Sequence, residues 1–375
     1  MKRALNPSEP GSLLPGLPPD AEILVIRLRS LGDVVLLTPA LAALHTWRRD
    51  LRISVLVEQA WVPVLEGNPA VAEILIAGSF VPTAARLYRK HFPVVFNQHG
   101  GPSSALLTAA SAADIRVCWR GRQFDFLYNV LAPDAAEYYG TLQVHTVEQR
   151  MAQFYWTGLP RAPIPRAQLF AQPDAIASVA KKLQERGVSS GQMYAVLQPG
   201  ARFYTKQWPI ERFVSISRWL RETYGVEPIV SLGPDELEIA NEARGQFGES
   251  ALVLASLDLR ELIALIAGAR LFVGNDAGPA HLAAAAGTPS VVIFGSSSSV
   301  HWRPWQAPHR VVQNDFQCNP CKGDRCYAYD EPRCILSVTY EQVRDACDAI
   351  LTNPSPSLSV RDDASAAIHK IDSAN

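Results

Sequence analysis

The chain has 375 residues, of which 35 are Lys or Arg and 36 are Asp or Glu, so its formal net charge is −1. Hydrophobic residues make up 48% and charged residues 19%, a composition that excludes a wholly disordered chain. The balanced charge lacks the electrostatic signature of a nucleic-acid-binding protein, so we expect no nucleic-acid partner. No stretch has the ~18 uninterrupted apolar residues that span a bilayer, and no signal peptide opens the chain. These features predict a soluble, cytoplasmic protein and leave a peripheral membrane contact open.

Proline-rich and polar segments divide the chain. At ~150 residues per domain, the length predicts two domains. Residues 1–20 are rich in proline and are expected to form a flexible lead, and residues 353–375 a flexible tail. A cluster of prolines over 158–174 marks the predicted boundary between a first domain, 21–170, and a second domain, 171–352.

Strand and helix signals alternate along both predicted domains. Short runs of β-branched residues predict strands that are buried on both faces. The predicted strands are 22–28, 53–57, 74–76, 94–97, 193–198, 228–232, 271–274 and 290–294. The predicted helices are 34–48, 61–66, 103–112, 177–186, 259–267 and 279–286, with another beginning at Pro209. This alternation favours an α/β protein with two doubly wound domains, each a parallel sheet covered by helices.

The most informative stretch is 274–289, which joins a predicted strand to a predicted helix. Gly278 permits a close backbone approach, and Pro279 suits the first helical position. The free N–H groups and the positive end of such a helix bind phosphate, and His281 in the first turn is placed to donate to a phosphate oxygen. Asp276 is an acceptor at the edge of the loop. The alternative is that Asp276 only caps the helix and that His281 is a surface histidine.

A second stretch, 198–209, also joins a strand to a helix. Arg202 and Lys206 are cations in a loop at the carboxyl edge of the predicted sheet, the usual ligand position in open α/β folds. Lys206 is expected to bind a diphosphate as a point charge. The alternative is a solvated lysine.

The third stretch, 27–33, follows the first predicted strand. Asp33 lies there at the carboxyl end of the strand, next to a helix start, where it is a candidate general base. Arg27 and Arg29 are close enough in sequence to hold an anionic substrate. The alternative is that Asp33 is an N-cap or first-turn carboxylate.

In combination these stretches resemble glycosyltransferase family 9, the bacterial lipopolysaccharide heptosyltransferases. The resemblance implies a GT-B fold, in which two Rossmann-like domains face each other across a cleft. It also implies an inverting transfer of a heptose, or a related sugar, from an ADP-activated donor to the lipopolysaccharide core or another envelope glycan. The matching pieces, in the order of the family, are 26–41, 67–69, 145–149, 206–209 and 274–289.

The resemblance also assigns roles to residues. Asp33 matches the base that takes the proton of the acceptor hydroxyl, and Lys206 matches the lysine that neutralises the leaving diphosphate. The loop 276–281 matches the part that binds the diphosphate and sugar of the donor. Asp235 is placed to contact the nucleoside ribose. Fixed donors and a cation at the departing phosphate stabilise the transition state, so no cofactor is required.

Three positions depart from the family pattern. Ala277 stands where family members often have a hydroxyl residue, and Ala201 and Arg202 replace small hydroxyl residues early in the Lys206 loop. One hydrogen bond to the donor phosphate is therefore expected to be missing, with Arg202 as its replacement.

The implied acceptor is an anionic glycolipid, which would bring the protein to the inner face of the cytoplasmic membrane. Arg29 and Ser30, beside Asp33, are expected to contact this acceptor. Arg120 belongs to a basic group with Arg116 and Arg122 and is expected to bind acceptor phosphates or carboxylates. The alternative is that this basic group is a solvated surface.

Four cysteines crowd into residues 318–334. The residues Cys318, Cys321, Cys326 and Cys334 have a spacing that admits one structural, tetrahedral zinc. Reduced thiols are the alternative, and disulfides are the least expected state in a cytoplasm.

Two other functions fit the same motifs. A nucleotide-sugar epimerase on this fold would turn over the donor without an acceptor. A non-catalytic sugar-nucleotide-binding protein would bind the donor without turning it over.

Overall fold

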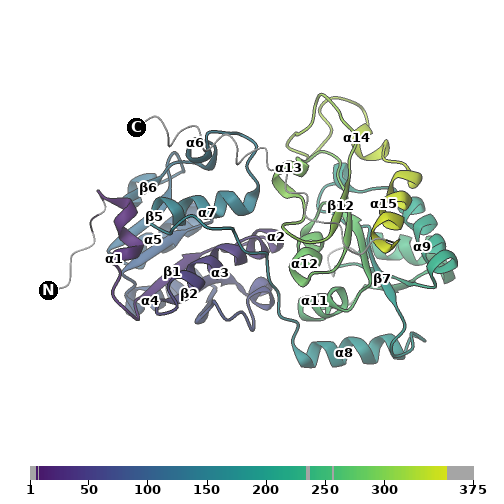
Figure 1. The fold of residues 1–375 in the computed structure, drawn as a ribbon, viewed down its shortest axis with the longest axis horizontal. Helices are drawn as coiled ribbons and strands as arrows, with labels where there is room; N and C mark the ends of the chain where they lie inside the picture. Colours follow the sequence, from purple (N-terminus) through teal and green to yellow (C-terminus); the bar gives the residue numbers. More distant parts are fainter. Residues whose placement is uncertain (1–5, 7, 234–236, 256, 353–375) are drawn as a thin grey trace.

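Two six-stranded parallel sheets, each covered by helices, make up the protein (Figure 1). The computed structural model describes residues 6, 8–233, 237–255 and 257–352. The strand order is β3-β2-β1-β4-β5-β6 in the first sheet and β12-β11-β10-β7-β8-β9 in the second. Counted within its own half, each sheet has the doubly wound order 3-2-1-4-5-6. The predicted fold class of two Rossmann-like units is confirmed.

The N-terminal half contains the first sheet and ends with a long helix, α7. Its strands are β1 (Glu22–Ile26), β2 (Arg52–Glu58), β3 (Glu73–Ala77), β4 (Val94–Asn97), β5 (Ile115–Trp119) and β6 (Val130–Ala132). Its helices are α1 (Leu13–Gly16), α2 (Leu31–Val35), α3 (Thr38–Trp47), α4 (Phe80–Lys90), α5 (Pro102–Ala110), α6 (Ala135–Tyr139) and α7 (Thr146–Trp156), with 3₁₀ turns η1 (Pro10–Ser12), η2 (Gln59–Val64) and η3 (Asp125–Leu127).

The C-terminal half contains the second sheet. Its strands are β7 (Tyr194–Gln198), β8 (Glu227–Ser231), β9 (Leu252–Leu254), β10 (Leu271–Asn275), β11 (Ser290–Ile293) and β12 (His309–Val312). Its helices are α8 (Pro173–Gln184), α9 (Ile210–Tyr224), α10 (Leu237–Phe247), α11 (Leu259–Ala267), α12 (Gly278–Ala286), α13 (Ser299–Trp302), α14 (Arg333–Leu336) and α15 (Tyr340–Thr352), with 3₁₀ turns η4 (Tyr204–Lys206) and η5 (Gly248–Ser250).

The predicted helix over 34–48 is two helices in the structure. α2 ends at Val35, and α3 begins at Thr38 with Pro39 in its first turn. Proline is well suited to a helix start but lacks the N–H that a continuous helix would need there. The break leaves α2 as a short helix whose N-terminus lies directly after β1.

The expected flexible lead is wrong for the part nearest β1. Leu13, Leu14 and Leu17 are buried in the hydrophobic core, at 3% exposure or less. The guanidinium of Arg48 donates to the carbonyl oxygens of Leu14 and Leu17, at 3.2 and 3.1 Å. The many prolines obscured this leucine-rich turn, which packs onto the N-terminal half. The predicted tail, 353–375, lies outside the described residues.

Apolar and polar contacts join the two halves. One continuous hydrophobic cluster contains core residues of both sheets. On α7, the N-cap His145 accepts from the Val147 N–H through Nδ1 at 3.1 Å, so its Nε2 carries the proton and donates to the Arg303 carbonyl at 2.9 Å. The His145 ring also packs on Trp305, with ring centroids 4.7 Å apart. The predicted domain boundary at residues 170 and 171 lies between α7 and α8 and stays a prediction.

No helix in the described part of the chain is long and apolar enough to cross a membrane.

The buried lead gives a testable prediction. Replacing Leu14, which is 0% exposed, with alanine is expected to cost about 2–5 kcal/mol, because a cavity opens in the core. Leu142→Ala is the matched control, since Leu142 is 81% exposed and its loss should change stability by less than about 0.5 kcal/mol. Urea unfolding followed by circular dichroism measures both. Equal stability of the two variants would contradict the packed lead.

Candidate active site

The candidate site lies where loops at the carboxyl ends of both sheets meet. In an open α/β sheet, ligands bind where the strand order reverses, which is between β1 and β4 in the first sheet and between β7 and β10 in the second. α2 follows β1, and α12 follows β10. The two helices pack directly against each other, so the predicted site stretches 27–33 and 274–289 are brought together.

Asp33 is the centre of a charged cluster in the N-terminal half. Its Oδ1 accepts from Arg150 of α7 at 2.8 Å and forms an ion pair with Arg27. Its Oδ2 accepts from the Ser30 hydroxyl at 3.0 Å. Both arginines also donate to the Gln98 carbonyl, which fixes their positions. Contacts to both carboxylate oxygens thus fix the orientation of Asp33, and 17% of its side chain is still exposed.

This environment sets the charge of Asp33. Burial alone would raise the pKa of the carboxyl, but the positive charges of Arg27 and Arg150, with hydrogen bonds from Arg27 and Ser30, lower it to about 2. Asp33 is therefore ionised at every pH at which the protein is expected to be folded.

One sequence interpretation around Asp33 needs correction. Arg27 was expected to hold an anionic substrate, but it is 7% exposed and paired with Asp33. Ser30 is exposed and its hydroxyl donates to Asp33, and its contact with the acceptor stays a prediction. Arg150 was not singled out at all, because it is 117 residues away in sequence and no local pattern marks it.

Lys206 and Asp276 form the corresponding polar pair in the C-terminal half. The Lys206 Nζ lies 2.7 Å from the Asp276 Oδ2, and the Ser297 hydroxyl donates to the same oxygen. Asn275, the last residue of β10, fixes both ends of the loop that contains Lys206. Its Nδ2 donates to the Pro199 carbonyl at 2.6 Å, and its Oδ1 accepts from the Trp208 N–H at 3.1 Å. The structure therefore brings together the two residues that the sequence placed in separate stretches.

The N-terminus of α12 has no side-chain cap. Ala277 is the N-cap and makes no side-chain cap hydrogen bond, and Pro279 is in the first turn. The remaining N–H groups and the positive end of this nine-residue helix keep their capacity to bind an anion. A Cβ on Gly278 would lie 2.8 Å from a methyl carbon of Leu31, so only glycine lets α2 approach this closely.

His281 is buried between the same two helices, so the alternative of a surface histidine is wrong. It is 4% exposed, and a Cβ on Gly32 would lie 2.6 Å from its Cδ2. Burial lowers the pKa of His281, which makes the neutral imidazole its form at neutral pH. Its Nδ1 has no hydrogen-bond partner among the described residues. A buried polar atom of this kind fits a ligand-facing position.

The other predicted site residues are scattered. Arg202 is exposed in the loop after β7, and Asp235 lies outside the described residues. Arg29 is two-thirds exposed, with Glu58 at 3.9 Å. Arg120 is exposed and pairs with Glu137 at 3.2 Å, so it is not available as an unpaired cation.

A different arginine, Arg122, lies beside the Asp33 cluster. Its guanidinium carbon is 5.7 Å from the centre of the Trp119 ring, and Arg150 lies 5.6 Å from the same ring. The side chain of Arg122 packs over Gly100, whose φ of 73° excludes most other residues. No ion pair or side-chain hydrogen bond of Arg122 occurs in the described ranges. Its neighbours in sequence gave no signal that separated it from Arg120.

His99 lies close to the arginines that surround Asp33. Burial first, and then the positive charges of Arg27 and Arg29, lower the pKa of His99 to about 4. The ring is therefore neutral at neutral pH, and its Nδ1 has no hydrogen-bond partner within the described segments.

The structure does not support the expected zinc site. Cys318, Cys321, Cys326 and Cys334 line one small cavity and are free thiols. A tetrahedral zinc needs four sulfurs about 2.3 Å from one point. Across the described residues, no group of three or more His, Cys, Asp or Glu side chains is arranged to hold a metal ion.

Solved structures share the fold. A glycosyl transferase family 9 protein from Veillonella parvula DSM 2008 superposes with a TM-score of 0.79 at 20% identity, covering 90% of this chain and 99% of that one. The E. coli ADP-heptose lps heptosyltransferase II gives a TM-score of 0.75 at 22% identity, covering 89% and 99%. These likenesses agree with the GT-B architecture of two Rossmann-like units.

Sequence comparison identifies the family. Lipopolysaccharide heptosyltransferase 3 of Escherichia coli (strain K12) is 27% identical over 350 residues, which cover 88% of this chain and 98% of that protein. The family model described as glycosyltransferase family 9 (heptosyltransferase) matches residues 83–330, more than half of the chain. The protein therefore belongs to glycosyltransferase family 9, the heptosyltransferases, and is a glycosyltransferase of lipopolysaccharide biosynthesis.

Proposed function

We propose that the protein transfers a heptose, with inversion, from ADP-heptose to a hydroxyl of an anionic lipopolysaccharide-core acceptor. The observation that carries this proposal is the contact of α2 with α12, which puts the oriented carboxylate of Asp33 beside an uncapped helix N-terminus. A base and an anion-binding group on opposite sides of one sugar are what an inverting displacement requires. The name of the E. coli heptosyltransferase II supports ADP-heptose as the donor.

The donor diphosphate is placed at the N-terminus of α12. The N–H groups near Gly278 and Pro279 bind its oxygens, and the neutral His281 adds a hydrogen bond through its unpartnered Nδ1. Lys206 supplies the positive charge that offsets the charge growing on the departing phosphate, and Asp276 with Ser297 fixes the position of that lysine. No metal is needed for this step. Arg202 extends the cationic side of the loop toward solvent.

The role of Asp33 follows from its charge. A carboxylate with a pKa of about 2 does not deprotonate a free sugar hydroxyl, but it accepts a hydrogen bond from that hydroxyl and orients its oxygen. As the oxygen bonds to the anomeric carbon, the carbon–phosphate oxygen bond breaks and its electron pair leaves with ADP. The hydroxyl then becomes strongly acidic, and its proton passes to Asp33 and on to solvent. Arg27 and Arg150 keep the carboxylate ionised and aimed.

The acceptor is placed along the N-terminal half. Arg122 has no carboxylate partner among the described residues, Arg29 has only Glu58 at 3.9 Å, and the buried Asp33 balances only one of the two arginines paired with it. The excess positive charge favours a phosphate or carboxylate on the acceptor. We assign this binding to Arg122 and Arg29, in place of Arg120. Such an acceptor would place the enzyme at the inner face of the cytoplasmic membrane.

Asp33→Asn tests the base. The rate of heptose transfer from ADP-heptose should fall by about a hundredfold to ten-thousandfold, while ADP binding measured by calorimetry stays within about threefold. Because the folded pKa is low, the activity of the unmodified enzyme should show no loss between pH 7 and 5 from this group. Unchanged transfer by the folded variant would refute the assignment. Circular dichroism checks folding, since the variant leaves two buried arginines without their anion.

Lys206→Ala tests the donor site. We expect ADP to bind about tenfold or more weakly, because a charge-assisted contact to the diphosphate is lost. Lys181→Ala is the matched control, since Lys181 lies on α8 with 77% of its side chain exposed. Calorimetric titration with ADP, and with GDP and UDP for selectivity, provides the readout. Equal ADP affinities of both variants would place the diphosphate elsewhere.

Arg122→Gln tests the proposed binding of the acceptor by Arg122. The KM for a lipopolysaccharide-core acceptor should rise about fivefold, while the KM for ADP-heptose stays unchanged. Arg120→Gln is the matched control, because this arginine is already paired with Glu137. If removal of phosphate from the acceptor abolishes the difference between the two variants, the contacted group is a phosphate. A larger effect at Arg120 than at Arg122 would reverse the assignment.

A further inference from the structure

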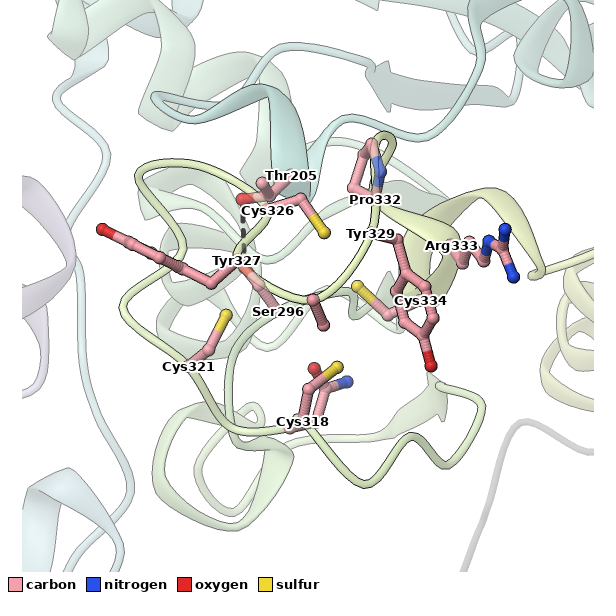
Figure 2. A pocket seen from close by; sticks show the side chains of 12 residues that line it. Thr205, Ser296, Cys318, Cys321, Cys326, Tyr327, Tyr329, Pro332, Arg333 and Cys334 are labelled. Carbon is pink, nitrogen blue, oxygen red and sulfur yellow. Dashed lines mark hydrogen bonds between the residues drawn. The ribbon is translucent and has the colours of Figure 1, made fainter.

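Four thiols line one cavity next to Thr205, which precedes the donor-site residue Lys206. Figure 2 shows the sulfurs of Cys318, Cys321, Cys326 and Cys334 directed into the same space, which Thr205 and Ser296 also line. All four are free. Cys318, Cys321 and Cys326 lie in the segment between β12 and α14, which has no regular helix or strand, and Cys334 lies in the first turn of α14. We name residues 313–334 the cysteine loop. It forms no part of the proposed transfer chemistry.

Hydrogen bonds tie the cysteine loop to the chain on either side of the donor site. The Cys321 N–H donates to the Ser296 carbonyl at 2.9 Å, and the Cys326 N–H donates to the Tyr204 hydroxyl at 3.0 Å. The Thr205 hydroxyl donates to the Gly323 carbonyl and lies 3.1 Å from the Ser296 hydroxyl. The loop therefore rests on residues 204–205 and 296.

The next residue along each of these two segments belongs to the donor site. Lys206 follows Thr205, and Ser297 follows Ser296; both contact the Asp276 carboxylate. A Cβ on Gly295 would lie 2.4 Å from the Thr205 carbonyl, so the two segments are packed without spare room. The contacts of the cysteine loop thus lie one peptide bond from Lys206 on one side and one peptide bond from Ser297 on the other.

The thiols of the loop differ from the other two cysteines. Cys318, Cys321 and Cys326 are partly exposed, whereas Cys118 and Cys347 are fully buried. Cys334 is 7% exposed, and burial raises the pKa of its thiol. Cys318 and Cys334, the first and last cysteines of the loop, line the same cavity. An accessible thiol with a second thiol across the same cavity is the arrangement of an oxidisable pair with a resolving cysteine.

We propose that the cysteine loop is a site of reversible oxidation by peroxides, in which Cys318 and Cys334 form a disulfide that weakens donor binding. The Cys318 thiolate attacks one peroxide oxygen, the O–O bond breaks, and a sulfenic acid and water form once a proton is taken up. The Cys334 sulfur then attacks the sulfenic sulfur, the S–S bond forms, and a second water leaves. Two thiols and one hydrogen peroxide thus give one disulfide and two waters. A dithiol reductant reverses the reaction by exchange.

The effect on the donor site follows from which residues the new bond encloses. Cys321, Gly323 and Cys326, which make the contacts to Ser296, Thr205 and Tyr204, all lie between the two bonded cysteines. Drawing the ends of the loop together moves these contacts, and Lys206 loses its fixed position. We expect ADP affinity to fall about tenfold, a usual size for coupling between two sites. This second part rests on the proposed donor site.

The experiment treats the full-length protein with hydrogen peroxide and maps disulfides by mass spectrometry of unreduced peptides. A Cys318–Cys334 linkage is expected, with Cys118 and Cys347 still reduced, and ADP affinity restored by dithiothreitol. Absence of the linkage overturns the modification site, as does stoichiometric zinc or iron retained through a chelator-free purification. If the linkage forms and ADP affinity stays the same, the coupling to the donor loops is refuted.

Two variants separate the thiol chemistry from general damage. Cys318→Ser should lose both the linkage and the response of ADP affinity to peroxide. Cys321→Ser, in the same cavity, should keep both and is the matched control. If the reduced, unmodified protein fails to bind ADP, the proposed donor site fails, whereas the peptide map still decides the oxidation by itself.

Discussion

The close packing of α2 on α12 is the constraint on which the rest of the site depends. It needs two residues without a side chain, Gly32 opposite His281 and Gly278 opposite Leu31. Each of the two helices follows a central strand of its own sheet, β1 for α2 and β10 for α12. Any larger residue at either glycine would separate the halves by pushing on a buried ring or a leucine. The fold thus sets the separation of Asp33 from the N-terminus of α12 by sterics rather than by charge.

The two parts of the site differ in their balance of positive and negative side chains. Two buried arginines hold one carboxylate on the side of Asp33, whereas one lysine and one carboxylate are matched around Lys206. The first part therefore carries surplus positive charge, whereas the charges of the second are balanced. A buried ion pair contributes little stability by itself, since desolvation offsets its attraction. Orientation of the reacting groups is the better account of why these charges are kept.

The sequence predicted the parts of the molecule that depend on local pattern. Runs of β-branched residues located the first strands of both sheets within two residues, and the glycine and proline of 274–289 located the start of α12. Partners far apart in the chain could not be inferred this way. Arg150 reaches Asp33 from a different helix, and only the folded chain distinguishes the free Arg122 from the paired Arg120. The buried Leu14 was missed because surrounding prolines suggested a loose segment.

The histidine that caps α7 has a consequence for how the halves separate. Its Nδ1 is occupied by a backbone N–H and its Nε2 donates across to the other half, and burial lowers the pKa of His145 to about 3. Neither mild acid nor added salt weakens such an uncharged link, in contrast to the Arg260–Glu66 ion pair nearer the surface. The contribution of His145 to the contact between the two halves is therefore nearly constant across the ionic conditions of a cell, whereas that of the ion pair is not.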